Sequence, residues 1–155
     1  MADTRQFCTF FVNDILFGVE VLDVQEVLRY QEMTEVPLSA SEVSGLINLR
    51  GQIITAIDLR GRMNLPPRKS GQKPMNVVIR TDNEVLSFLV DSIGDVLEID
   101  EESFEAAPDT IDNATRELVS GVYKLEGRLM MVLDAAKAAQ LSTPEGSASG
   151  PSSAG

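Results

Sequence analysis

An internal repeat limits, more than any other feature, how this chain can fold. Residues 45–58 and 121–134 lie 76 positions apart and are identical at four positions, which hold Gly, Leu, Gly and Asp in that order. Most of the other positions keep their polarity. Residues 24–28 and 93–97 match in the same way at a distance of 69 positions. Two matches in the same order along the chain predict two copies of one folding unit.

Most of the chain shows the pattern of short strands. Apolar and polar side chains alternate in runs separated by turn residues, which predicts strands paired as hairpins. The strands are expected at residues 8–12, 15–22, 47–49, 53–57, 77–81, 85–91, 93–99, 118–125 and 128–133. Two units of a few short strands each predict two small barrels. Side chains fill a barrel of this size, so function is expected on its outer surface and at the seam between the barrels.

Three segments depart from the strand pattern. Asp23 is a suitable N-cap for a short helix over residues 24–28, whose apolar positions have helical spacing. Residues 60–74 carry three prolines and five of the thirteen basic residues, which predicts a flexible, solvated connector. Residues 100–117 are acidic and predict an exposed loop with a helical turn.

Composition excludes several classes of activity. The chain has no His and one Cys, Cys8, so it lacks the residues for a Ser-His-Asp or Cys-His nucleophile and for most zinc sites. The sequence also holds no cluster with metal-ligand spacing, and neither a metal nor a cofactor is expected. The net charge of −11 argues against nucleic-acid binding, because such binding depends on Lys and Arg. With no signal peptide and no apolar run long enough to enter a membrane, the protein is expected to be cytoplasmic.

The segment that ends the first unit carries a resemblance to a known family. Residues 45–60, GLINLRGQIITAIDLR, strongly resemble the signature of the CheW family, the coupling proteins of bacterial chemotaxis. The resemblance covers about residues 5–141. Thr55 departs from the family pattern, which usually has Pro there, and this changes strand rigidity only locally. Further agreement lies in four shorter motifs, at residues 17–19, 23–27, 36–37 and 90–96.

The resemblance implies a mainly β fold, with two interlocked five-stranded SH3-like β-barrels and short helices. We expect a single domain over residues 5–141. Its first barrel is expected at about residues 12–65, its second at about 75–133, and a closing helix at 134–141. Residues 142–155 are rich in Ser and Gly and have little apolar surface to bury, so a disordered tail is expected there.

The resemblance also implies a non-catalytic adaptor that couples transmembrane chemoreceptors to the CheA histidine kinase in chemotaxis signalling. The regulatory domain of the kinase would bind mainly to the first barrel. The cytoplasmic helical tip of the receptor would lie in a groove between the barrels. By itself the chain is expected to be a monomer, and it would join membrane receptor arrays through these partners.

The family motifs assign candidate residues to both surfaces. By similarity, Arg50 and Glu26 are expected to form an ion pair near the kinase-binding face. Gly45 and Gly121 are expected to allow close approach of the receptor helix. The kinase-binding candidates are Glu26, Tyr30, Arg50 and Asp58, and the receptor-binding candidates are Val24, Gly45, Ile93, Val96 and Gly121.

Two alternatives from the sequence stay open beside the chemotaxis adaptor. One is a CheW-like scaffold for another chemosensory-type pathway, such as type IV pilus motility. The other is an enzyme that uses carboxylates alone, for example Asp58 with Asp134 or Asp91 with Asp95. Against the enzyme, Asp58 and Asp134 follow strands at repeated positions, where helix capping explains them more simply.

Overall fold

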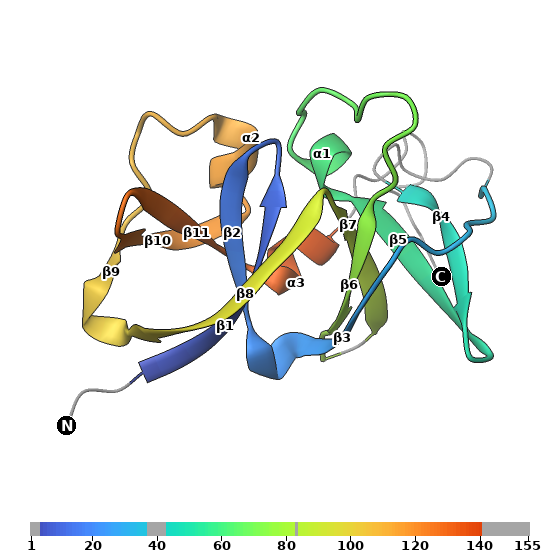
Figure 1. Ribbon diagram of the computed structural model, residues 1–155, viewed down its shortest axis with the longest axis horizontal. Coiled ribbons are helices and arrows are strands. Elements are labelled where there is room, and N and C mark those ends of the chain that lie inside the picture. Colours follow the sequence, from blue (N-terminus) through green and yellow to red (C-terminus); the bar gives the residue numbers. More distant parts are fainter. Residues whose placement is uncertain (1–3, 37–42, 83, 141–155) are drawn as a thin grey trace, which may run out of the picture.

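The computed structural model describes residues 4–36, 43–82 and 84–140, and Figure 1 shows how their strands and helices are arranged. No helix in these ranges is long and apolar enough to cross a membrane. The strands are β1 (Thr4–Val12), β2 (Ile15–Glu20), β3 (Val24–Leu28), β4 (Val43–Leu49), β5 (Gln52–Asp58), β6 (Met75–Arg80), β7 (Val85–Val90), β8 (Ser92–Asp100), β9 (Phe104–Glu105), β10 (Val119–Leu125) and β11 (Arg128–Leu133). The helices are α1 (Leu59–Arg62), α2 (Asn113–Arg116) and α3 (Ala135–Ala139), with 3-10 turns η1 (Val21–Asp23) and η2 (Glu101–Ser103).

The strands form two sheets, and each sheet takes strands from both repeat units. Sheet A has the order β8-β1-β2-β11-β10-β9, and sheet B has the order β3-β6-β7-β5-β4. The first repeat unit comprises β1 to β5, and the second comprises β6, β7, β8, β10 and β11. Each unit places its first two strands in one sheet and its last three in the other. This exchange interlocks the two units in a mainly β fold, as the family resemblance implies.

The exchange changes the boundaries of the two barrels. From the sequence, the first barrel is expected at about residues 12–65 and the second at about 75–133. In the structure β1 and β2 join the sheet built from residues 92–133, whereas β6 and β7 join the sheet that contains β3, β4 and β5. Hairpin patterns identify strands that are neighbours within a unit. They do not identify which distant strand pairs with a given strand. This distant pairing decides the residue boundaries of the two barrels.

The pairing registers repeat as the sequence does. Phe17 of β2 pairs with Met131 of β11, and the corresponding pair of Leu86 in β7 and Thr55 in β5 is also parallel. Phe17 and Leu86 lie 69 positions apart, and Thr55 and Met131 lie 76 apart, which are the two spacings of the repeat. A β-bulge occurs at the same place in the β4–β5 and β10–β11 hairpins. The sequence repeat is therefore a structural repeat.

The helix predicted over residues 24–28 is wrong, because this segment is strand β3. Val24 lies opposite Ile79, and Val27 lies opposite Val77, in an antiparallel pairing with β6. Only the three residues before β3 form a helical turn, η1. A segment this short is a poor helix in isolation, and β-branched valines favour a strand. The pairing with β6, which lies far along the chain, therefore decides its structure.

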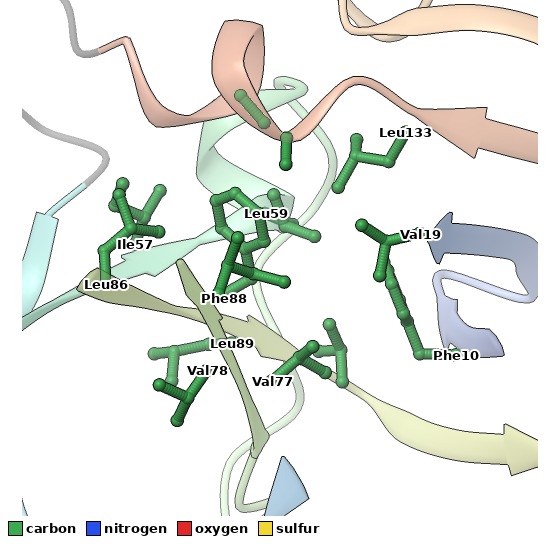
Figure 2. Close-up of a cluster of buried hydrophobic side chains, with 14 of the residues drawn as sticks. Phe10, Val19, Ile57, Leu59, Val77, Val78, Leu86, Phe88, Leu89 and Leu133 are labelled. Carbon is green, nitrogen blue, oxygen red and sulfur yellow. The ribbon is translucent and has the colours of Figure 1, made fainter. Parts of the chain in front are cut away.

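One buried cluster joins the two sheets. It contains Phe10 and Val19 from sheet A together with Ile57 and Phe88 from sheet B and Leu59 of α1. Figure 2 shows these side chains gathered between the strands of the two sheets. A second, smaller cluster lies within sheet A alone. Because the larger cluster is continuous across both sheets, burial of its apolar surface holds them together.

The remaining segments agree in part with the sequence. Asp134 accepts a 3.1 Å hydrogen bond from the backbone N–H of Lys137 and so caps α3, within the closing helix predicted at residues 134–141. The acidic segment 100–117 contains α2 and mostly exposed residues, but it also forms β9, which pairs with β10. The tail predicted at residues 142–155 lies outside the described residues.

Candidate functional site

An exposed ion pair joins the two sides of sheet B. Arg50 lies at the turn between β4 and β5, and its guanidinium donates a hydrogen bond to the carboxylate of Glu26 on β3. Because β3 and β4 are the two outer strands of sheet B, the pair connects opposite edges of the sheet. The side chain of Arg50 is 66% exposed and that of Glu26 is 23% exposed. The predicted ion pair is confirmed, although Glu26 lies on a strand.

The backbone of Arg50 is unusual. Its φ of +54° lies in the left-handed region, which is uncommon for residues other than Gly, Asn and Asp. Gly51 follows with a φ of +90°, and its N–H donates a 2.9 Å hydrogen bond to the side chain of Asn48. At the corresponding position of the β10–β11 turn, Glu126 does not have a positive φ. The first turn therefore holds an arginine where Gly or Asn would fit more easily, which marks a functional candidate.

Tyr30 follows β3 in the chain and lies beside β4. It is half-buried and lines a cleft of about 710 Å³ together with Leu46 and Asn48 of β4. The amino group of Lys73 lies 5.2 Å from the centre of the Tyr30 ring, a cation–π contact. Three of the four predicted kinase-binding residues, Glu26, Tyr30 and Arg50, thus belong to the region of β3 and β4.

The sequence analysis missed Ile53, the apolar side chain next to this region. Ile53 pairs with Asn48 across the β4–β5 hairpin and is 60% exposed, whereas its neighbour Ile54 is fully buried. Two adjacent isoleucines do not reveal which one faces solvent. The only signal in the sequence was an apolar residue close to the turn that carries Arg50.

Asp58 makes its contacts within the chain. Its carboxylate accepts a 3.0 Å hydrogen bond from the backbone N–H of Arg60, which caps α1, and lies 2.8 Å from a guanidinium nitrogen of Arg68. The predicted capping role is confirmed. Since Asp134 caps α3, the two carboxylates considered for catalysis belong to different helix starts. Asp58 also lines a cleft of about 390 Å³ with Tyr30, which connects it to the kinase-binding candidates.

Two arginines of the predicted connector, residues 60–74, form a network with two aspartates, Asp58 and Asp91. Arg60 donates to Asp91 twice, from Nε to Oδ1 at 2.9 Å and from Nη2 to Oδ2 at 2.7 Å. Arg68 lies 2.8 Å from Asp58 and 3.0 Å from Asp91. The side chains of Arg60 and Arg68 are only 12% and 9% exposed. The prediction of a solvated charge run is therefore wrong for these two residues.

The network keeps Asp91 ionised. Burial by itself raises the pKa of Asp91, but hydrogen bonds from Arg60 and from the backbone N–H of Asn13, with the charges of Arg60 and Arg68, bring the pKa below its ordinary value. The same hydrogen bond raises the pKa of Arg60. Arg60 and Asp91 both belong to family-like motifs, but their positions in the sequence do not show that they pair.

The apolar receptor-binding candidates lie on the outer strands of different sheets. Val24 is on β3 of sheet B, whereas Ile93 and Val96 are on β8 of sheet A. Val24 and Ile93 are half-buried and pack against the shared core. Val96 is 58% exposed, and Val27, which corresponds to it at the repeat spacing of 69, is 37% exposed. Val96 is therefore the most accessible of the predicted receptor-binding side chains.

The two glycine candidates are covered by the chain itself. A Cβ on Gly45 would lie 2.7 Å from the carbonyl oxygen of Thr34, and a Cβ on Gly121 would lie 2.1 Å from the ring of Phe104. Both glycines thus allow close approach of the protein's own backbone and side chains. The expectation that a receptor helix approaches Gly45 and Gly121 is corrected, because neighbouring segments already fill that space.

Comparison with known proteins gives consistent matches. The family model of the CheW-like domain matches residues 6–142. The chemotaxis protein CheW of Bacillus subtilis (strain 168) is 31% identical over 131 residues, covering 84% of this chain and 84% of that protein. The chemotaxis protein CheW of Thermotoga maritima is 29% identical over 126 residues, covering 81% of this chain and 82% of that protein.

A solved structure agrees with the fold. The crystal structure of the scaffolding protein TtCheW from Thermoanaerobacter tengcongensis matches with a TM-score of 0.75 and 28% identity, covering 86% of this chain and 89% of that chain. The predicted fold of interlocked SH3-like barrels is thereby confirmed. Since the family model and the relatives each cover most of the chain, this protein belongs to the CheW family and is a chemotaxis scaffold.

Proposed function

We propose that this protein couples chemoreceptors to a CheA-type histidine kinase by binding the regulatory domain of the kinase and the cytoplasmic helical tip of the receptor. The observation that carries the proposal is the match of a CheW-like domain to residues 6–142, over the whole interlocked fold. In this role the protein performs no chemistry. It associates with membrane receptor arrays through its partners.

The kinase-binding surface is proposed where the Arg50–Glu26 pair joins β3 to the β4–β5 turn. Arg50 offers an accessible guanidinium, and Ile53 offers exposed apolar area beside it. Arginine and aromatic residues are common anchors of protein interfaces, which supports a role for Tyr30 as well. The cleft that Tyr30 shares with Asp58 extends this surface toward α1.

Loss of the Arg50–Glu26 pair should have different effects if the pair only stabilises the fold and if it binds the kinase. A solvent-exposed pair contributes about 0–1 kcal/mol to stability, so its loss should hardly affect folding. A pair at the centre of an interface should affect kinase binding much more than stability. The left-handed backbone of Arg50 supports the binding role, because a purely structural turn would favour Gly or Asn.

The receptor-binding surface is proposed around Val96 on β8, with Val24 and Ile93 as further, half-buried candidates. An amphipathic helix binds by placing its apolar face against exposed apolar side chains, and Val96 is of this kind. Gly45 and Gly121 contribute by letting Thr34 and Phe104 pack closely, which shapes the surface without contacting the receptor.

Reconstitution with purified components tests the proposal. Receptor-containing membranes, the host's CheA-type kinase and this protein should give receptor-controlled autophosphorylation only when all three are present. The chain by itself should neither bind nor turn over ATP. ATP hydrolysis by the isolated chain would contradict the adaptor function. If the chain captures instead a kinase of a type IV pilus pathway and has no effect on the chemotaxis kinase, the scaffold serves that second pathway.

A further inference from the structure

A cleft of about 630 Å³ lies between the β1–β2 turn and the segment that follows α1. Its charged lining residues are Asp14, Arg60, Arg68, Lys69, Lys73 and Asp91. Four of the thirteen basic residues of the chain are gathered here, in a protein with a net charge of −11. The cleft is thus a local reversal of the overall charge.

The positive charge of this cleft is not fully neutralised within the chain. Arg60 pairs with Asp91, and Arg68 pairs with Asp91 and with Asp58, which is not among the residues that line the cleft. Lys69 and Lys73 are exposed, and within the described residues neither forms an ion pair with a carboxylate. Even if Asp14 offsets one of these two lysines, the cleft keeps an excess of positive charge.

Arg68, which lines the cleft, has one guanidinium nitrogen without an acceptor in the part of the chain that the structure describes. Its side chain is 9% exposed, and Nη1 contacts Asp58. Nε lies 3.0 Å from Oδ1 of Asp91, whereas Nη2 is buried and, within the described residues, has no hydrogen-bond partner. Burying a charged donor without an acceptor costs free energy, so such a group indicates an acceptor that comes from outside the chain.

We propose that this cleft binds the phosphate group of a small molecule. Ammonium and guanidinium groups together recognise phosphate through charge-assisted hydrogen bonds, and Lys69, Lys73 and Arg68 supply both kinds. A phosphate dianion neutralises the two lysines at once and has oxygens left to accept from Arg68. The volume lies within the range of small-molecule sites. The proposal is independent of the adaptor function, because it uses none of the residues assigned to the kinase or the receptor as ligand contacts.

Titration of the full ¹⁵N-labelled chain with inorganic phosphate tests the site, at an ionic strength held constant with chloride. Saturable amide shifts are expected at Asn13 and at residues 68–73. The double variant Lys69→Gln/Lys73→Gln should raise the half-saturation concentration about tenfold or more, which corresponds to about 1.4 kcal/mol. The matched control Lys124→Gln/Lys137→Gln changes the net charge equally, away from the cleft, and should leave the half-saturation concentration within about twofold.

Three results would overturn the proposal. Shifts that grow linearly without saturation would show general screening instead of a site. Equal weakening in both double variants would show an effect of net charge. Tighter saturation by malonate than by phosphate, at the same residues, would assign the cleft to dicarboxylates and not to phosphate. Both double variants change only exposed side chains, so each is expected to fold, and the spectra of the labelled chain report this directly.

Discussion

Arg60 and Asp91 join the two sheets through a two-point ion pair. Asp91 is the single residue between β7 of sheet B and β8 of sheet A, and Arg60 lies in α1, directly after β5. The two hydrogen bonds measure 2.9 and 2.7 Å. Asp91 also accepts a 2.7 Å hydrogen bond from the backbone N–H of Asn13, in the β1–β2 turn. One carboxylate therefore connects α1, the crossing between the sheets and a hairpin of sheet A.

Replacing Asp91 by Asn should destabilise the fold markedly. The variant leaves Arg60 without its charge partner and weakens the contacts of Arg68, both of which are nearly buried. Breaking a fully buried pair costs about 3–5 kcal/mol, and partial exposure of Asp91 should reduce this to about 2 kcal/mol. Urea unfolding measures the change. Asp95→Asn, at an exposed position on β8, is the control and should change the unfolding free energy by less than about 0.5 kcal/mol.

Asp91 should also make stability depend on pH in acid. Its pKa is lower in the folded protein than in the unfolded chain, so the unfolded state binds more protons as the pH falls. The contribution is complete above the unfolded pKa of about 3.9 and is lost as the pH drops through the folded pKa. Below about pH 4, the unfolding free energy of the wild type should therefore fall more steeply than that of Asp91→Asn. Urea unfolding over a series of pH values measures this, and parallel curves would contradict the assignment.

Arg50→Asn separates the binding role of Arg50 from its structural role. Asn tolerates the left-handed backbone of the turn, so only the ion pair with Glu26 is lost, and stability should change by less than about 1 kcal/mol. Binding to the regulatory domain of the kinase, measured by calorimetry, should weaken by about tenfold or more. Lys124→Asn, on β10, is the control and should bind normally. Unchanged kinase binding in Arg50→Asn would remove Arg50 from the interface.

Val96→Asp should prevent receptor binding without unfolding the protein. The side chain is 58% exposed, so the new carboxylate stays hydrated in the free protein and loses that hydration only when a receptor helix covers it. Co-sedimentation with receptor membranes measures the loss, and kinase binding should persist. Val27→Asp, at the corresponding position of β3, is the matched control. If Val27→Asp loses the receptor and Val96→Asp does not, the receptor lies on the other outer strand.

Gly121→Ala should lower stability, because its Cβ would lie 2.1 Å from the ring of Phe104 and 2.6 Å from the carbonyl oxygen of Glu105. Overpacking of this kind costs about 1–3 kcal/mol. Combining Gly121→Ala with Phe104→Ala should recover part of the loss, since the larger of the two clashes is removed. Thermal unfolding of the two single variants and the double variant measures the coupling. Strict additivity would show that Phe104 does not limit the space at Gly121.

The repeat and the family-like motifs predict much of the fold. The hairpins follow from alternating apolar residues and turn signals, and the spacings of 69 and 76 recur in the pairing registers. The Arg50–Glu26 pair could be predicted because both residues belong to recognisable motifs. Asp58 and Asp134 were correctly predicted as helix caps because a strand that ends at Asp before a short helix is a local sequence pattern.

The candidate site could be predicted only in part, because burial depends on contacts that local patterns do not contain. Gly45 and Gly121 were expected to be open to a partner, yet Thr34 and Phe104 cover them. Ile53 was not assigned to the surface, because an apolar residue next to another apolar residue gives no sign of which faces solvent. These outcomes were decided by segments that reach the site from elsewhere in the chain.

By itself the sequence determined the family, the two-unit organisation and the local turns, since periodicity, glycines and capping residues act over a few neighbouring positions. Only the tertiary structure decided that residues 24–28 form a strand, which strands the two units exchange, and that Arg60 and Arg68 are held by Asp91. The physical reason is the same in each case. Hydrogen bonds between strands and ion pairs between buried groups join residues far apart in sequence, and their free energy outweighs weak local preferences.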